Sequence, residues 1–159
     1  MKQVKILIIS IIILIITGCV AKEIKESDSY SFNYNGINIA ISDNMKEVLT
    51  NFSNYISYQE TMSCAFEGLD KIYTYEHFEI STYPKNNLDY VLSIYLLDDT
   101  VSTNEGIKIN DTYDKLVATY GKEYKNEGNE YKYIKNNVSL SFIIENNHII
   151  QIAYSLVLE

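Results

Sequence analysis

The stretch GIKINDTYDKLVATYG, residues 106–121, decides the fold. Its apolar residues follow the i, i+3, i+4, i+7 spacing that places side chains on one face of a helix. These residues are Tyr113, Leu116, Val117 and Tyr120. Asp111 precedes them and is placed to cap the exposed N–H groups of the first turn. Gly121 follows them and suits a left-handed helix end. The stretch therefore predicts a short amphipathic helix.

An equivalent pattern begins 68 residues earlier, at Asp43. The stripe that follows it consists of Met45, Val48, Leu49 and Phe52. A pair of alternating isoleucines precedes each helix, Ile39 with Ile41 in the first copy and Ile107 with Ile109 in the second. Because the aspartate, the stripe and the preceding strand all agree in position, the pattern predicts an internal repeat.

Segments rich in β-branched and aromatic residues follow each helix and predict strands. The first copy contains KIYTYEHFEISTYP (71–84) and DYVLSIYLL (89–97). The second copy contains EYKYIKNNVSLSFII (130–144) and HIIQIAYSL (148–156). Asn35-Gly36, between alternating apolar residues, predicts a further hairpin before the first helix.

Two-residue turns are predicted at 76–77 and at 136–137. At the last hairpin a three-residue loop, 146–148, is preferred, because it pairs Ile144 with Ile150 on the core face. A slip of one residue would turn every following side chain to the other face. The predicted core face consists of Tyr73, Tyr75, Phe78, Ile80, Leu92, Ile94, Leu96, Tyr131, Tyr133, Leu140, Phe142, Ile150, Ile152 and Tyr154.

The opposite face of the predicted sheet mixes hydroxyl side chains with scattered aromatic and branched apolar residues. Its members are Ile72, Thr74, Ser81, Tyr83, Val91, Ser93, Tyr95, Ile134, Ser139, Ser141, Ile143, Ile149 and Gln151. This mixture is too apolar for a purely solvated face and too polar for a second core, so it predicts a contact surface. Its candidate binding residues are Ile72, Tyr83, Tyr95, Ile134 and Ile143. Alternatively, the two units pack against each other through this face.

The string GIKINDTYDKLVATYG followed by EYKYIKNNVSLSFIIENNHIIQIAY resembles repeats of the β-lactamase inhibitory protein type and of the small SmpA/OmlA (BamE) lipoproteins. The longer string from SCAFEGLDKIYTYEHFEISTYP to GIKINDTYDKLVATYG resembles a group of clostridial-type lipoproteins of unassigned function. The resemblance covers roughly residues 36–157 and implies an α+β fold. The predicted domain spans 31–159. It would contain two tandem units, about 31–99 and 100–159, each a short helix packed on an antiparallel sheet and used to bind proteins.

The N-terminus reads ILIISIIILIITGCV over residues 6–20. Its apolar run is too short to span a membrane, which needs about 20 apolar residues, and it matches the core of a signal peptide. The residues 16–19, Ile-Thr-Gly-Cys, resemble a bacterial lipobox, which implies cleavage before Cys19 and a diacylglycerol on its thiol. Residues 1–18 are thus a predicted signal peptide and 19–30 a lipidated cysteine with a flexible tether. An ordinary signal peptide with an incidental cysteine is the alternative.

The chain carries a formal net charge of −8 and contains no arginine. Removal of the leader would take away two lysines and no acid, which makes the remainder more acidic. Because surfaces that bind nucleic acids depend on clustered lysine and arginine, a nucleic acid is excluded as an expected partner. With Cys19 lipidated, Cys64 would be the only thiol left, so no internal disulfide is expected.

The residues that could be catalytic or bind a metal do not form a recognisable motif in the sequence. Cys64 lacks a nearby cation, so it is interpreted as a buried free thiol, with a nucleophile as the alternative. His77 and His148 are interpreted as turn residues. The acidic residues of LLDDTVSTNEG, Asp98, Asp99 and Glu105, could bind calcium, although their spacing matches no EF-hand and favours a solvated linker. No catalytic residue, metal site or cofactor is predicted.

These observations predict a lipoprotein anchored to the outer side of a cell membrane through Cys19, which binds a protein or peptide partner through a sheet face. The alternatives are an exported enzyme that uses Cys64 and a structural scaffold of the cell envelope. The oligomeric state is left open.

Overall fold

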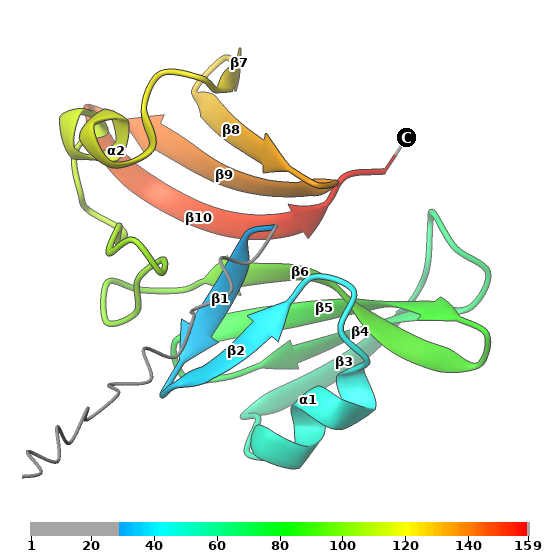
Figure 1. Ribbon diagram of the computed structural model, residues 1–159. Helices are drawn as coiled ribbons and strands as arrows, with labels where there is room; N and C mark the ends of the chain where they lie inside the picture. Colours follow the sequence, from blue (N-terminus) through cyan, green and yellow to red (C-terminus); the bar gives the residue numbers. More distant parts are fainter. Residues whose placement is uncertain (1–28, 159) are drawn as a thin grey trace, which may run out of the picture.

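The computed structural model describes residues 29–158, which form an α+β fold with one large antiparallel sheet and two helices (Figure 1). The sheet has the strand order β3-β4-β5-β6-β10-β9-β8-β7. Its strands are β3 (Ser57–Met62), β4 (Leu69–Thr74), β5 (Phe78–Lys85), β6 (Leu88–Leu96), β7 (Lys125–Glu127), β8 (Glu130–Lys135), β9 (Val138–Glu145) and β10 (His148–Leu156). The remaining elements are the hairpin β1 (Ser31–Tyr34) and β2 (Ile37–Ala40), and the helices α1 (Met45–Asn51) and α2 (Tyr113–Tyr120).

The single eight-stranded sheet corrects the prediction of two tandem units, each with its own sheet. The last strand of each half, β6 and β10, pair with each other in antiparallel register. Leu96 lies opposite Ile152, and Ser93 lies opposite Ser155. An unpaired strand edge exposes a row of N–H and C=O groups, so this pairing removes one open edge from each half. The two halves therefore share one sheet and one core.

Both predicted helices are confirmed, but their caps differ from the prediction. Asn44 caps α1 by accepting a hydrogen bond from the N–H two residues later at 3.0 Å, and Thr112 caps α2 by accepting from the N–H three residues later at 3.3 Å. Asp43 and Asp111 each accept instead from the backbone N–H three residues earlier, both at 2.8 Å. The two aspartates therefore close the turn before each helix and do not cap the helix. Gly121 ends α2 with a positive φ of 81°, as predicted.

The predicted strand before each helix exists only in the first half, where β2 precedes α1. Residues 107–109 form a loop, and the N–H of Thr103 donates to the carbonyl of Ile107 at 2.8 Å. Ile107 is fully buried all the same. Its apolar side chain thus packs into the core without strand pairing.

The hairpin register confirms two of the predicted turns and corrects the third. Tyr73 lies opposite Ile80 and Tyr133 opposite Leu140, as expected for turns at 76–77 and 136–137. At the last hairpin, however, His148 pairs directly with Glu145, which leaves a two-residue turn. The two asparagines of that turn, at 146 and 147, both have positive φ. This is the conformation that tight hairpin turns require and that asparagine tolerates.

A β-bulge at Ile150 explains why the loop prediction failed, and a second bulge lies at Leu92. Each bulge inserts one unpaired residue and changes which side chains point inward. Val91 and Ile149, which were predicted on the opposite face, are therefore completely buried in the core. Ile150 is 45% exposed, and Leu92 lies outside the core cluster, so neither belongs to the core face as predicted.

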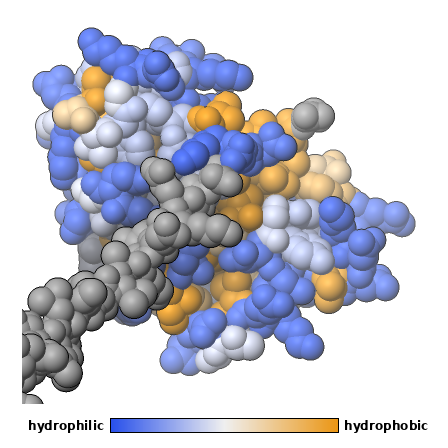
Figure 2. Space-filling view, viewed as in Figure 1, coloured by the Kyte–Doolittle hydropathy of each residue, from blue (hydrophilic) through white to orange (hydrophobic). Residues whose placement is uncertain are grey.

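The hairpin β1–β2 lies between the two halves of the sheet (Figure 1). Phe32 projects from it and is completely buried. Its ring centroid lies 5.1 Å from that of Phe78 in β5 and 6.2 Å from that of Tyr154 in β10. The predicted Asn35-Gly36 turn thus places one aromatic ring against both halves. Seen from the side of the hairpin, most of the surface is hydrophilic, with apolar residues gathered between the halves (Figure 2).

Within residues 29–158, the structure contains no helix that is long and apolar enough to cross a membrane. The apolar run at 6–16, Cys19 and most of the predicted tether lie outside the described residues.

We expect Phe32→Ala to lower the free energy of unfolding by about 3–5 kcal/mol, because it leaves a cavity at the contact between the halves. Chemical denaturation followed by tyrosine fluorescence and by circular dichroism measures the change. Asn38→Ala, an exposed position on the same hairpin, is the control and should change stability by less than about 0.5 kcal/mol. A Phe32→Ala variant as stable as this control would contradict the role assigned to Phe32.

Candidate functional site

The candidate site is the sheet face opposite the helices and the hairpin, called here the outer face. Side chains of neighbouring residues along a strand point to opposite faces, so cross-strand partners share a face. One row of partners across the sheet is Ile72, Ser81, Ser93, Ser155, Ser139 and Ile134. A second row is Thr74, Glu79, Tyr95, Ala153, Ser141 and Lys132. Small side chains therefore occupy the centre of the outer face, and larger ones lie toward its sides.

The serine side chains on this face are short and lie between larger side chains. Ser93, Ser139 and Ser141 are buried although they face outward. The hydroxyls of Ser81 and Ser93 are 2.6 Å apart and form a hydrogen bond across β5 and β6. Because a hydroxyl both donates and accepts, such a surface can hydrogen-bond to a partner without adding net charge.

Larger side chains on the outer face supply apolar contact area and balanced charge. Tyr95 is 37% exposed and Ile134 is 41% exposed. Beside Ile134, a groove of about 340 Å³ runs over β7, β8, β9 and the end of β10. The ammonium of Lys132 lies on its wall, 3.0 Å from Glu130 and 3.3 Å from Glu127. The hydrogen bond to Glu130, reinforced by Glu127, raises the pKa of Lys132.

The predicted binding residues do not all reach the surface. Tyr95 and Ile134 are exposed, and Ile72 and Ile143 are half-buried. Tyr83 is only 7% exposed because the ring of Phe66 stacks on it at a centroid distance of 4.7 Å. Tyr83 therefore supports the fold at one end of the face and offers a partner almost no area. The alternative prediction, that the two units pack against each other through this face, is wrong. The halves of the sheet meet edge to edge through β6 and β10.

Phe66 belongs to the loop between β3 and β4, residues 63–68. This loop folds over the sheet, which the sequence analysis did not predict. Gly68 closes this loop with φ of 127°, and a Cβ at this position would lie 3.0 Å from Pro84. Glycine suits this position, because a side chain there would crowd Pro84 and would be strained at this positive φ. Cys64 lies in the same loop and is exposed, so the prediction of a buried thiol is wrong.

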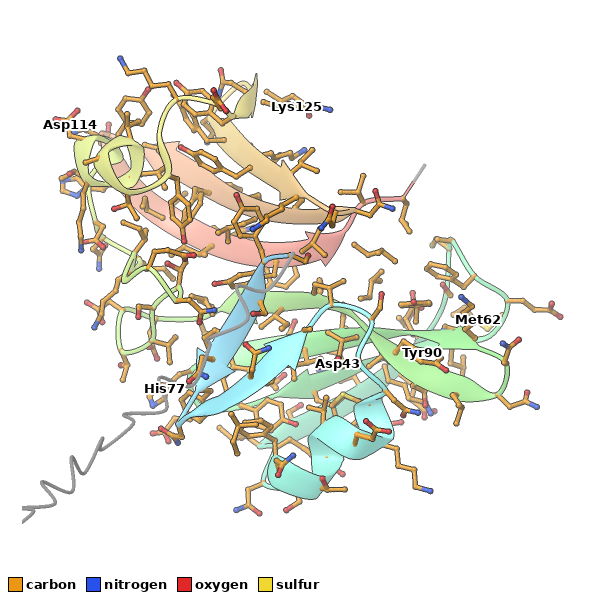
Figure 3. The ribbon with its side chains drawn as sticks, viewed as in Figure 1. Asp43, Met62, His77, Tyr90, Asp114 and Lys125 are labelled. Atoms are coloured by element: carbon orange, nitrogen blue, oxygen red, sulfur yellow. The ribbon has the colours of Figure 1, made fainter. Side chains whose placement is uncertain are left out.

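The two histidines form separate contacts. The Nδ1 atom of His77 is 2.8 Å from the carboxylate of Asp98, and the Nδ1 atom of His148 is 2.9 Å from the carbonyl of Asn110 (Figure 3 labels His77). His77 lies in a turn, as predicted, whereas His148 is the first residue of β10. Neither of these contacts involves Cys64.

The acidic residues that were considered for calcium do not form one cluster. Asp98 accepts from His77, and Glu105 accepts from the hydroxyl of Tyr120, while Asp99 is exposed. In the part of the chain that the structure describes, no group of three or more histidine, cysteine or carboxylate side chains could hold a metal ion.

Comparisons with family models, with curated proteins and with solved structures give no match. The resemblance to inhibitor and lipoprotein repeats therefore stays a prediction from the sequence.

The His77–Asp98 pair predicts a pH-dependent contribution to stability. The hydrogen bond to Asp98 raises the pKa of His77 above its usual 6.5, and it lowers the pKa of Asp98 below its usual 3.8. The stabilisation by the pair is fully present between pH 3.8 and pH 6.5, the usual pKa values of the two groups. It is lost as the pH rises through the raised pKa of His77, and also as the pH falls through the lowered pKa of Asp98.

We expect Asp98→Asn to lower the pKa of His77, as measured by NMR titration of its imidazole C–H signals. Glu76→Gln is the matched control, because Glu76 lies 3.8 Å from the other ring nitrogen and contributes less to the raised pKa. A larger shift in the Glu76 variant than in the Asp98 variant would show that the pair is assigned wrongly.

Proposed function

We propose that this chain is a lipoprotein held at the outer side of a cell membrane through Cys19, and that it binds a protein partner through the outer face of its sheet. The observation that carries the second part is the outer face itself. Tyr95 and Ile134 are exposed there beside a row of serine hydroxyls. Exposed aromatic and apolar anchors next to groups that can hydrogen-bond are typical of protein interfaces.

The charge of the chain limits the kind of partner. The formal net charge is −8, and the chain has no arginine to bind phosphate. On the outer face, Lys132 is already paired with two glutamates. The proposed partner therefore offers a neutral or basic protein surface, with an apolar pocket for Tyr95.

The anchor part of the proposal rests on residues outside the described range. Two acyl chains hold a protein stably at a membrane, whereas one holds it only marginally. A diacylglycerol on Cys19 would thus suffice, and the intervening residues up to Ser29 would give the domain reach from the membrane surface.

We expect Cys19→Ser to abolish incorporation of labelled palmitate when the full chain is expressed in a bacterium, and to release the protein from the membrane fraction. Cys64→Ser, which removes the other cysteine, is the matched control and should leave both the label and the membrane association unchanged. Palmitate incorporation that survives Cys19→Ser would overturn the anchor proposal without touching the binding proposal.

The binding proposal predicts that a captured partner depends on Tyr95 and Ile134. Full-length protein with a C-terminal tag, solubilised in detergent, is used to capture proteins from envelope extract and culture fluid. We expect Tyr95→Ala/Ile134→Ala to weaken retention of a specific partner by at least about tenfold, as for interface hot spots.

The control variant is Tyr55→Ala/Leu69→Ala, which removes side chains of matching type and similar exposure away from the outer face. Tyr55 packs instead against Tyr73, on the core side of the sheet, at a centroid distance of 5.3 Å. Circular dichroism confirms that each variant folds. A partner that is retained by the first variant and lost from the control would move the site off the outer face.

A further inference from the structure

The two edges of the large sheet differ in how they are protected. The edge strand β7 has only three residues, two of which are charged, Lys125 and Glu127. The other edge strand, β3, has six residues and a single charge, Glu60. Natural sheets shorten or charge their edges to prevent pairing with another chain. Among the described residues, β7 follows this rule and β3 does not.

The hydrogen-bond pattern shows which backbone groups β3 leaves open. The N–H of Ser63 donates to the carbonyl of Gly68 at 3.1 Å, in the same register as the β3–β4 ladder. Because pairing alternates along an antiparallel ladder, the backbone of every second residue before Ser63 also points toward β4. The N–H and C=O groups of Tyr58, Glu60 and Met62 therefore point toward the open edge.

The side chains around this edge are unusually exposed for apolar residues. Ile56 is 71% exposed, Met62 is 75% exposed, and Tyr58 is 40% exposed. Met62 stands at one edge of the sheet and Lys125 at the other (Figure 3). Apolar side chains that flank an open row of backbone groups are the features of an edge that takes up another strand.

We propose that β3 pairs with β3 of a second copy of this chain, antiparallel, with the two Gln59 residues opposite each other. In this register Tyr58 of each copy lies opposite Glu60 of the other. The paired segment ends at Ser57, because the N–H of Ile56 donates to the carbonyl of Thr74 in β4 at 2.7 Å. Within one copy the hydroxyl of Tyr58 already donates to the carboxylate of Glu60, so the two side chains are compatible partners. The strand is thus complementary to itself in the hydrogen bonds that its side chains can form.

The neighbouring registers are less complementary. Centring the pair on Glu60 would place two like charges directly opposite each other, which is destabilising. Centring it on Thr61 would place Glu60 opposite Met62, and Tyr58 beyond the end of the strand, opposite Cys64. Of these three arrangements, the one centred on Gln59 pairs the carboxylate of Glu60 with a hydroxyl donor, Tyr58.

Such a dimer joins two eight-stranded sheets edge to edge and leaves both outer faces on the same side. Two copies would then present two binding faces on the same side of one continuous sheet. Linked sites of this kind bind more tightly than single ones without any new contact. The dimer itself rests on β3 alone and does not depend on the proposed binding function.

The register is tested by disulfide trapping in membranes that contain the full chain. In a Cys64→Ser background, Gln59→Cys should form an intermolecular disulfide on mild oxidation, because the two positions face each other at the two-fold axis. Thr61→Cys is the matched control, on the same strand and the same face. In the proposed register Thr61 lies opposite Ser57, so this variant should form at least about tenfold less dimer. The Cys64→Ser parent reports any disulfide made through Cys19.

A second variant tests the backbone pairing. Glu60→Pro removes an N–H that points to the open edge and leaves the bonds to β4 intact, since proline is tolerated at such edge positions. We expect the variant to fold, as checked by circular dichroism, and its dimer dissociation constant in detergent to rise at least about tenfold. Sedimentation equilibrium measures the constant.

Three outcomes would overturn the proposal. The wild-type chain could have the mass of one copy at all accessible concentrations. Thr61→Cys could cross-link as readily as Gln59→Cys, which would indicate another register or random collision. Gln59→Cys could also cross-link to a protein other than this chain, which would show that β3 pairs with a different protein.

Discussion

The pairing of β6 with β10 is the constraint on which the rest of the structure depends. It joins the two halves edge to edge, so that their apolar faces line a single core. The hairpin β1–β2 then finds apolar surface on both sides, and Phe32 contacts an aromatic ring from each half. Without this pairing, each half would expose one more strand edge and would lack half of the cavity into which Phe32 packs.

The two halves are built with corresponding contacts. The hydroxyl of Tyr75 donates to the carbonyl of Phe52 at the end of α1, and the hydroxyl of Tyr133 donates to the carbonyl of Gly121 at the end of α2. The distances are 2.9 and 2.8 Å. A tyrosine on the sheet thus holds the C-terminal end of each helix and satisfies a carbonyl that the helix itself leaves open. The last strand of each half also carries one bulge, at Leu92 in β6 and at Ile150 in β10.

The outer face and the edge strand β3 offer different kinds of contact. The outer face is lined by short hydroxyls between Tyr95 and Ile134, so the proposed partner would be recognised by side chains. The edge of β3 exposes backbone N–H and C=O groups, so the proposed second copy would be recognised by strand pairing. The two surfaces can therefore act together, because strand pairing at the edge does not cover the face.

Local patterns in the sequence were sufficient for the helices, for the Asn35-Gly36 hairpin and for two of the tight turns. These features depend on residues within a few positions of one another, through helical spacing and positive φ. The sequence also placed Tyr95 and Ile134 on the outer face, because strict alternation holds on that part of each strand.

Tertiary structure alone decided the union of the halves, the two bulges and the burial of Tyr83. The β6–β10 pairs join residues more than fifty positions apart, and no local pattern encodes such a pairing. A bulge shifts alternation by one residue, which places Val91 in the core although the sequence pattern puts it outside. Tyr83 is covered by Phe66 from a distant loop, in which Gly68 avoids crowding against the sheet. In each case the deciding energy is packing between segments that the chain brings together only when it folds.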